Sequence, residues 1–288
     1  MARFRLLLIM RIDSHQHFWR YDQEEYAWIS DEMLALQRDF LPRDLEPALA
    51  SIGFHGAVAV QARQSLEETN WLLELAREHN FIQAVVGWVD LCSPDLPSQL
   101  ERLAQHPKLA GVRHVVQDEA DDEFMLRPDF KHGISRLREF NLTYDLLLYP
   151  KHLPVAVKLV EAFPDQPFVV DHLAKPGIAD RLLSPWSEQI RTLGSLPNAY
   201  CKLSGMVTEA KWRQWQPGDF RPYLDIIFEA FGFDRLMIGS DWPVCLLSAE
   251  YDEVMHIVVD YLGNFPAEVQ AAVLGENCTR FYSIEGKD

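Results

Sequence analysis

The stretch Ile12-Asp13-Ser14-His15-Gln16-His17-Phe18-Trp19 follows a short apolar run near the start of the chain and contains two histidines. Side chains at positions i and i+2 of a β-strand point to the same face, so His15 and His17 are expected to project side by side. Two converging imidazoles suit either a divalent metal or an electron-rich oxygen. An H-x-H triplet also arises by chance, so its meaning depends on which other residues reach the same point.

The composition is that of an ordinary globular protein, with 48% hydrophobic and 24% charged residues among 288. Lys and Arg total 27 against 43 Asp and Glu, which gives a formal charge of -16. This acidic balance argues against nucleic acid or an anionic membrane as a partner. The four cysteines form no CxxC pair, so reduced thiols and a cytoplasmic location are expected.

The first ten residues resemble a signal peptide only superficially. Their apolar stretch, residues 6–10, has no small-residue cleavage site and continues into Ile12. No stretch approaches the roughly 20 apolar residues of a membrane span. We therefore expect residues 1–10 to be an N-terminal extension and residues 11–288 to form one domain, with either Met1 or Met10 as the natural start.

Eight short β-rich runs recur along the chain, and amphipathic segments separate most of them. The segment 65–80 is typical, with helical spacing of its apolar residues behind a capping box of Ser65 and Glu68. Such alternation predicts βαβ units, and eight units in a chain of this length favour an α/β fold of the (β/α)8 TIM-barrel type. No dinucleotide or P-loop glycine motif follows a predicted strand. The predicted strands are 11–18, 55–62, 83–90, 110–116, 143–149, 168–173, 199–205 and 235–242, and the other predicted helices are 96–105, 127–140, 153–163, 219–231 and 250–262.

Active sites of TIM barrels lie at the C-terminal ends of the strands, so the residues that end each run are site candidates. Asp171 is expected to orient a histidine rather than to react, and Lys202 could equally be a structural ion-pair member. Arg113 and His114 point to opposite faces, so only one is expected to face the lumen. The long first connection, 19–43, is rich in aromatic residues that either cap the barrel or form a site wall. The candidates at the barrel mouth are His15, His17, Gln61, Arg63, Arg113, Tyr144, His172, Lys202 and Asp241.

Four strings together carry a specific resemblance: residues 12–19, 171–176 (DHLAKP), 201–210 (CKLSGMVTEA) and 239–244 (GSDWPV). They resemble the sugar-lactonase branch of the amidohydrolase superfamily, a group that includes L-fuconolactonases and L-rhamnonolactonases, with pyrone-dicarboxylate lactonases more distant. The resemblance spans residues 11–282 and implies a (β/α)8 barrel with the site at its mouth. It also implies a hydrolase that opens the ring of a sugar lactone.

We hypothesise a lactonase mechanism with roles for particular residues of this sequence. Asp241 would act as general base on water, while His15, His17 and His172 would stabilise the oxyanion. The substrate contacts would be Gln61, Arg63, Arg113, Tyr144, Lys202 and Glu209, with Trp28 or Trp212 as an apolar wall.

The sequence departs from the two-metal pattern of the superfamily. The fourth predicted strand offers Arg113 and His114 where a bridging carboxylated lysine or glutamate is expected, and the fifth has no histidine. A two-metal centre is therefore not expected. One Zn²⁺ could be held by His15, His17, His172 and Asp241. A lactone is an activated ester, and the resemblance implies that such a metal is dispensable.

Two other functions stay open at this stage. One is a metal-dependent decarboxylase or hydratase of the same superfamily, or a pyrone-dicarboxylate-type lactonase, for which Arg63, Arg113 and Lys202 would bind carboxylates. The other is a sugar-acid binding protein without turnover. The preferred lactone, its ring size and the oligomeric state are left open by the sequence.

Overall fold

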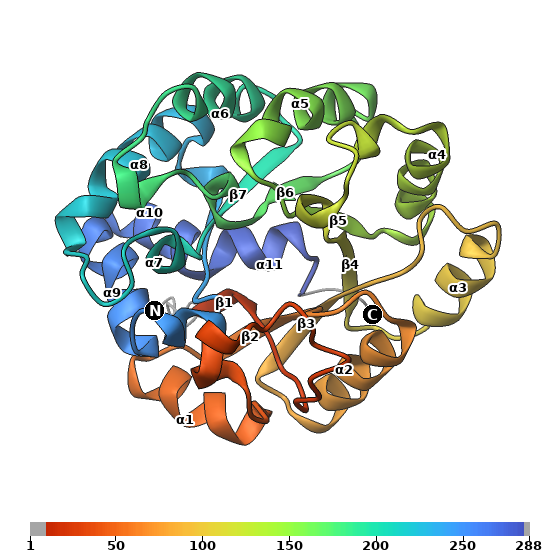
Figure 1. The fold of residues 1–288 in the computed structure, drawn as a ribbon, viewed down its shortest axis with the longest axis horizontal. Helices are drawn as coiled ribbons and strands as arrows, with labels where there is room; N and C mark the ends of the chain where they lie inside the picture. Colours follow the sequence, from red (N-terminus) through yellow and green to blue (C-terminus); the bar gives the residue numbers. More distant parts are fainter. Residues whose placement is uncertain (1–9, 285–288) are drawn as a thin grey trace, which may run out of the picture.

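Eight parallel strands pair in the order β1 to β8 in the computed structural model of this chain, which describes residues 10–284 (Figure 1). An isolated parallel bridge between Gln16 and Trp242 joins the last strand to the first, so the predicted (β/α)8 barrel is confirmed. Each strand ends before its predicted run does, because the residues that follow are turns at the barrel mouth. The strands are β1 (Ile12–Gln16), β2 (Gly56–Val60), β3 (Ile82–Gly87), β4 (Leu109–His114), β5 (Thr143–Leu146), β6 (Phe168–Val170), β7 (Ala199–Leu203) and β8 (Leu236–Ile238).

Helices surround the strands as an outer ring (Figure 1). Helices α1, α6, α7, α10 and α11 lie outside the predicted set. Of these, α1 and α6 bury residues at helical spacing, as Trp186, Ile190 and Leu193 do in α6. No described helix is long and apolar enough to cross a membrane. The helices are α1 (Pro42–Ser51), α2 (Leu66–Glu78), α3 (Leu96–Leu103), α4 (Pro128–Leu137), α5 (Leu153–Ala162), α6 (Trp186–Gly194), α7 (Met206–Glu209), α8 (Pro217–Phe231), α9 (Tyr251–Leu262), α10 (Ala267–Ala271) and α11 (Asn277–Phe281).

The capping box predicted before α2 forms only in part. Ser65 Oγ accepts a hydrogen bond from the Glu68 backbone N–H at 3.1 Å, as expected. The Glu68 carboxylate does not return the bond, because it accepts from the backbone N–H groups of Ala62 and Arg63 instead, each at 2.9 Å. The prediction of a reciprocal box is therefore wrong, and Glu68 stabilises the preceding loop.

The N-terminal half of the lumen is apolar. Ile12, Val58, Val86 and Met237 pack there against Tyr282, which follows α11. This last helix therefore closes the end of the barrel opposite the mouth. Of the predicted N-terminal extension, residues 1–9 lie outside the described residues. All four cysteines lie within residues 10–284 and are free thiols, as predicted.

The junction between β1 and β8, called the seam below, contains a fully buried carboxylate, that of Asp13. Its Oδ1 accepts from the backbone N–H groups of His15 and Ser240, at 3.1 and 2.9 Å. Its Oδ2 accepts from the hydroxyls of Ser240 and Tyr251, at 2.6 and 3.2 Å. Four hydrogen bonds to one anion join the first strand, the last strand and α9.

A shift in strand register explains how Asp13 and His15 reach different surroundings. Asp13 pairs with Ala57 and Gln16 with Ala59, so β1 has one more residue than β2 between these two pairs. A β-bulge of this kind interrupts the alternation of side chains. Asp13 consequently contacts α9 outside the barrel, while His15 enters the lumen.

We expect Asp13→Ala to destabilise the protein by about 3–5 kcal/mol, because it leaves buried donors without an acceptor. Urea denaturation followed by circular dichroism measures the free energy of unfolding. Ser14→Ala is the matched control: Ser14 is equally buried, but its hydroxyl has no hydrogen-bond partner among the described residues. Equal stability of the two variants would contradict the role of Asp13.

Candidate functional site

A cavity of about 570 Å³ opens at the barrel mouth, beyond the ends of the strands. His17, Arg113, His172 and Asp241 lie among the residues that line it, and the remaining lining residues come from the turns after the strands. The cavity therefore lies where the sequence predicts the site.

Three imidazole rings and one carboxylate converge at this cavity. Asp241 Oδ1 lies 3.3 Å from His17 Nε2, 3.8 Å from His172 Nε2 and 3.9 Å from His15 Nε2. The Nε2 atoms of His15 and His17 are 3.2 Å apart. All four residues are buried. The structure thus brings together the four residues predicted to be catalytic, and their catalytic role stays a prediction.

Backbone hydrogen bonds across the seam fix the position of Asp241. Its N–H donates to the His15 carbonyl at 2.8 Å, and the His17 N–H donates to the Trp242 carbonyl at 2.6 Å. The carbonyl of Asp241 accepts from the Cys245 N–H at 2.9 Å. Asp241 itself has φ +59°, a left-handed conformation that is uncommon outside glycine. The seam that closes the barrel therefore also holds Asp241 in a strained conformation beside two histidines.

His172 is presented by a left-handed turn after β6. All four residues of the turn, 172–175, have φ between 51° and 56°. Such backbone costs roughly 1–2 kcal/mol per residue, so surrounding contacts must hold it. Ser204 Oγ lies 2.9 Å from His172 Nδ1, and a Cβ on Gly205 would come within 2.6 Å of the ring. Only glycine at position 205 leaves room for this imidazole.

A layer of buried charges, called the ionic layer below, lies between the apolar lumen and the histidines. Lys202 Nζ is 2.5 Å from Asp145 Oδ2 and 3.0 Å from Asp171 Oδ1. Arg113 Nη1 is 3.0 Å from Asp171 Oδ2. Two cations balance two carboxylates, as buried charges require. Lys202 is thus a member of a structural ion-pair network.

His15 contacts the ionic layer through Nδ1. This atom is 3.2 Å from Asp171 Oδ1 and 3.1 Å from Lys202 Nζ, so it can either donate to the carboxylate or accept from the ammonium. Asp171 is therefore placed to orient a histidine. When Nδ1 accepts, Nε2 carries the proton and can donate to His17; when Nδ1 donates, the lone pair of Nε2 is free.

The pKa values in the cluster favour neutral imidazoles beside an ionised carboxylate. Burial lowers the pKa of His15 well below its usual range and that of His172 to about 4. Burial alone would raise the pKa of Asp241, but the neighbouring imidazoles of His172, His17 and His15 hold it below its usual range. At neutral pH, Asp241 is therefore ionised and able to accept a proton.

Five of the eight predicted substrate contacts border the cavity, namely Trp28, Arg63, Arg113, Glu209 and Trp212. Burial raises the pKa of Glu209, and Lys175 opposes this shift.

Three predicted substrate contacts do not reach the cavity, and their assignment is corrected. Lys202 is fully buried in the ionic layer. Gln61 lies behind Arg113, and its Oε1 accepts from Arg113 Nη2 at 3.2 Å. Tyr144 points outward from β5, where its ring packs against Phe168, because alternate residues face opposite sides and Asp145 takes the lumen.

The same alternation on β4 agrees with the prediction that only one of Arg113 and His114 faces the lumen. Arg113 contacts His15 and Asp171 there, at 3.3 and 3.0 Å. His114 stacks on Phe124 outside the barrel, with ring centroids 4.9 Å apart.

The cavity also contains residues that the sequence analysis does not assign to substrate. They include Glu25, Met33, Gln117 and Lys175. The sequence could have indicated Lys175, because this residue lies three positions after His172 in one of the four strings. The others lie in irregular loops, where neither periodicity nor spacing indicates which side chains turn inward.

The loop between β1 and α1 covers one side of the cavity and is fixed by two polar contacts. Glu25 Oε2 lies 2.7 Å from Arg63 Nη1, in the loop after β2. The Tyr26 hydroxyl donates to Glu68 Oε1 at 3.0 Å. Since Glu68 Oε2 also accepts from the backbone of Arg63, one buried carboxylate joins both loops.

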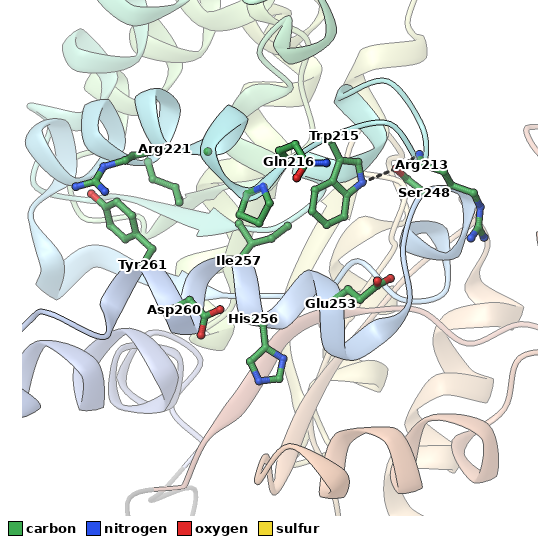
Figure 2. A pocket seen from close by; sticks show the side chains of 13 residues that line it. Arg213, Trp215, Gln216, Arg221, Ser248, Glu253, His256, Ile257, Asp260 and Tyr261 are labelled. Atoms are coloured by element: carbon green, nitrogen blue, oxygen red, sulfur yellow. Dashed lines mark hydrogen bonds between the residues drawn. The ribbon is translucent and has the colours of Figure 1, made fainter.

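A larger cavity, of about 640 Å³, lies outside the barrel mouth, beside α8 and α9 (Figure 2). Trp215 Nε1 donates to Ser248 Oγ at 3.1 Å at one side of it. Glu253, His256 and Asp260 project separately from α9 in this view and do not converge on one point (Figure 2). Reactive side chains therefore converge on one point only in the barrel-mouth cavity, which is the smaller of the two.

The residues at the barrel mouth fit a zinc ion. His15, His17 and Asp241 each offer one ligand atom, all within 4.8 Å of one another. Tetrahedral zinc with bonds of about 2.0–2.1 Å holds neighbouring ligand atoms about 3.3 Å apart. The His15–His17 and His17–Asp241 separations are close to this value, at 3.2 and 3.3 Å, and the His15–Asp241 separation is longer, at 3.9 Å. His17 Nδ1 donates to the Val60 carbonyl at 2.8 Å, which directs the lone pair of Nε2 into the site. His172, the fourth predicted ligand, is not part of this three-residue set.

Comparison with known proteins agrees with this architecture. The amidohydrolase family model matches residues 12–284. The chain is 42% identical to the L-fucono-1,5-lactonase of Burkholderia multivorans over 288 residues, which cover 96% of each chain. It is 37% identical to the L-fucono-1,5-lactonase of Burkholderia ambifaria, covering 96% of this chain and 97% of the relative.

A solved structure of an amidohydrolase from Burkholderia multivorans with bound zinc superposes with a TM-score of 0.91. The two chains are 42% identical, and the match covers 96% of this chain and 100% of that one.

Glu68 gives a test of how the two loops are joined. Burial raises its pKa to about 7, against the hydrogen bonds from Arg63, Ala62 and Tyr26. Because this value exceeds the ordinary 4.5, the folded protein binds more protons than the unfolded chain between about pH 4.5 and 7. The contribution of Glu68 to the free energy of unfolding therefore falls as pH rises through this window.

We expect the stability of the wild type relative to Glu68→Gln to decrease from pH 5 to pH 7.5, as measured by urea denaturation. Glu67→Gln is the control, since Glu67 is the exposed neighbour on the same helix and its pKa is lowered. A stability difference between wild type and Glu68→Gln that is independent of pH would rule out the raised pKa.

Proposed function

This chain belongs to the amidohydrolase family, and we propose from that premise that it hydrolyses the ring ester of a sugar lactone. The observation that carries the proposal is the ionised Asp241 beside three buried imidazoles at the barrel mouth. Two relatives named L-fucono-1,5-lactonase, matched over nearly the whole chain, support the substrate class.

In the proposed reaction, Asp241 removes a proton from water, and the resulting hydroxide adds to the lactone carbonyl carbon. The tetrahedral intermediate carries its negative charge on the former carbonyl oxygen. On collapse, the bond from the carbonyl carbon to the ring oxygen breaks. The proton held by Asp241 passes to that oxygen, which becomes a hydroxyl of the sugar acid.

The sequence analysis assigns all three histidines to stabilisation of the oxyanion, but their hydrogen bonds give them different roles. The His17 tautomer that donates through Nδ1 to Val60 has no proton on Nε2, and this nitrogen then accepts a hydrogen bond from His15. His172 donates through Nε2 when Ser204 donates to its Nδ1. We assign the oxyanion to His172 and the Arg113 guanidinium, with His15 and His17 as orienting groups.

A zinc ion held by His15, His17 and Asp241 would act as a Lewis acid on the carbonyl when bound. The chain also satisfies these groups without it. In the tautomer in which Lys202 donates to His15 Nδ1, His15 Nε2 donates to His17 Nε2 and His17 Nδ1 donates to Val60, so each ring nitrogen has a partner.

The ion pairs argue against the decarboxylase and pyrone-dicarboxylate alternatives. Arg63 is paired with Glu25, and Arg113 with Asp171. Lys202 is paired with two carboxylates in the ionic layer. Arg63 and Lys202 are therefore already engaged by carboxylates of the chain itself, and of the three cations only Arg113, which has further N–H donors, is left for the substrate.

We expect Asp241→Asn to lower kcat for lactone hydrolysis by about 10³-fold or more, because an amide cannot accept the proton from water. Acid release in a pH-stat with L-fuconolactone measures turnover. Asp118→Asn, which changes an exposed carboxylate at the same cavity, is expected to retain activity within a few-fold. Near-normal turnover by Asp241→Asn would rule out the proposed base.

We expect lactone hydrolysis to survive removal of zinc, because the hydrogen-bonded chain from Lys202 to Val60 leaves the site ordered without a cation. Activity after dialysis against a chelator, compared with residual zinc measured by atomic emission, tests this. Loss of turnover with the metal, and its return on adding Zn²⁺, would show instead that the metal is essential.

A further inference from the structure

The ring of His15 lies between two cations, one at each nitrogen. Lys202 Nζ is 3.1 Å from Nδ1, and Arg113 Nη1 is 3.3 Å from Nε2. Both cations are also paired with Asp171, Lys202 through Oδ1 and Arg113 through Oδ2, each at 3.0 Å. Ammonium and guanidinium groups only donate hydrogen bonds, whereas a neutral imidazole has a single accepting nitrogen. His15 can therefore accept from Lys202 or from Arg113, but not from both.

The ammonium of Lys202 needs His15 as an acceptor. It is fully buried and carries three N–H groups. Among the described residues, the acceptors near it are Asp145 Oδ2 at 2.5 Å, Asp171 Oδ1 at 3.0 Å and His15 Nδ1. A proton on Nδ1 would leave one N–H of the ammonium facing another donor in a buried place, which is costly. The ionic layer therefore favours the ring in which Nδ1 accepts and Nε2 carries the proton.

The guanidinium of Arg113, by contrast, has another place for its donor. Its Nη2 contacts the backbone carbonyl and Oε1 of Gln61, and its Nη1 donates to Asp171 Oδ2. One N–H of Nη1 then remains, and Arg113 borders the cavity. When Lys202 donates to His15, this N–H is free for the oxyanion. When Nδ1 carries the proton instead, Arg113 donates to Nε2 and the oxyanion loses a donor.

Tyr282 controls how strongly Asp145 attracts Lys202. The Tyr282 hydroxyl donates to Asp145 Oδ2 at 2.8 Å, and the same oxygen accepts from Lys202. Asp145 Oδ1 has no hydrogen-bond partner among the described residues, so these two donors alone satisfy the carboxylate. Without the hydroxyl, Lys202 would be the only donor to a buried anion and would be drawn toward it, away from His15. Three successive hydrogen bonds thus connect the residue after α11 with the site.

We infer that Tyr282 is a positioning residue for the reaction: through Asp145 and Lys202 it keeps the proton of His15 on Nε2 and leaves an N–H of Arg113 for the oxyanion. The ring is neutral in both forms, so only the position of its proton differs. The inference deepens the proposed function, on which its kinetic test rests, whereas the position of the proton can be measured without turnover.

The test locates the ring proton by two-bond ¹H–¹⁵N NMR of the metal-free, full-length protein labelled with ¹⁵N-histidine. The signal of His15 is identified by its absence from His15→Gln. The wild type is expected to carry the proton on Nε2, and Tyr282→Phe to carry it on Nδ1 in most molecules. Since only molecules with the Nε2 proton offer the Arg113 donor, kcat of Tyr282→Phe is expected to fall about 3–10-fold, with KM within about 2-fold.

Zinc affinity is a second readout that does not depend on turnover. His15 Nε2 has a lone pair for a metal only when the proton is on Nδ1. Tyr282→Phe is therefore expected to bind Zn²⁺ about 3–10-fold more tightly than the wild type, because more of its molecules have this ring form. Competition with a chromogenic chelator measures the dissociation constant.

Tyr144→Phe is the matched control. Tyr144 is also buried and is the neighbour of Asp145 on β5, but its ring points outward and its hydroxyl has no hydrogen-bond partner among the described residues. All three readouts are expected to stay at their wild-type values in this variant.

Lys202→Met combined with Asp145→Leu tests the same competition if Tyr282→Phe does not fold. This double variant removes one charge of each sign and leaves Arg113 as the only donor at His15, so the proton is expected on Nδ1. A proton that stays on Nε2 in every folded one of these variants, or an equal change in Tyr144→Phe, would overturn the inference. Failure of the wild type to hydrolyse any sugar lactone would overturn the proposed function and leave the NMR result standing.

Discussion

The Asp13 carboxylate is the interaction on which both the barrel and the site depend. A parallel barrel must join its last strand to its first, and β8 is short. Asp13 supplies four acceptor contacts at this junction, two of them to Ser240, the residue before Asp241. The hydrogen bonds that close the barrel therefore also fix the position of the proposed base beside His15 and His17.

The site is rigid because its strained backbone is surrounded by contacts that cannot move independently. Asp241 and the turn 172–175 are left-handed, which persists only where packing determines it. Below them, Lys202 and Asp171 are held in the ionic layer, so a shift of His15 would break its buried contacts with both. A preorganised arrangement of this kind can stabilise developing charge without rearranging during the reaction.

The barrel and the four central residues could be predicted because they depend on regular features of the sequence. Strands alternate with helices, and polar residues accumulate where each strand ends. Which side chain faces the cavity was less predictable. Tyr144 and Asp145 are neighbours on one strand, so only one of them can face the lumen. Which one does so depends on the strand register, and a β-bulge can reverse the order. Gln61 and Lys202 do lie near the site, but beneath the cavity wall. Their depth is set by packing, which leaves no pattern in the sequence.

One short turn joins the proposed base to the wall of the cavity. Asp241 leads into the 3-10 turn Val244–Leu247, and both ends of that turn, Val244 and Leu247, line the cavity. The hydrogen bond from the Cys245 N–H to the Asp241 carbonyl closes the segment between them. A substitution that shifts this turn is therefore expected to misplace the base as well as the wall. Misplacement is costly to a reaction that depends on the orientation of water toward a carbonyl.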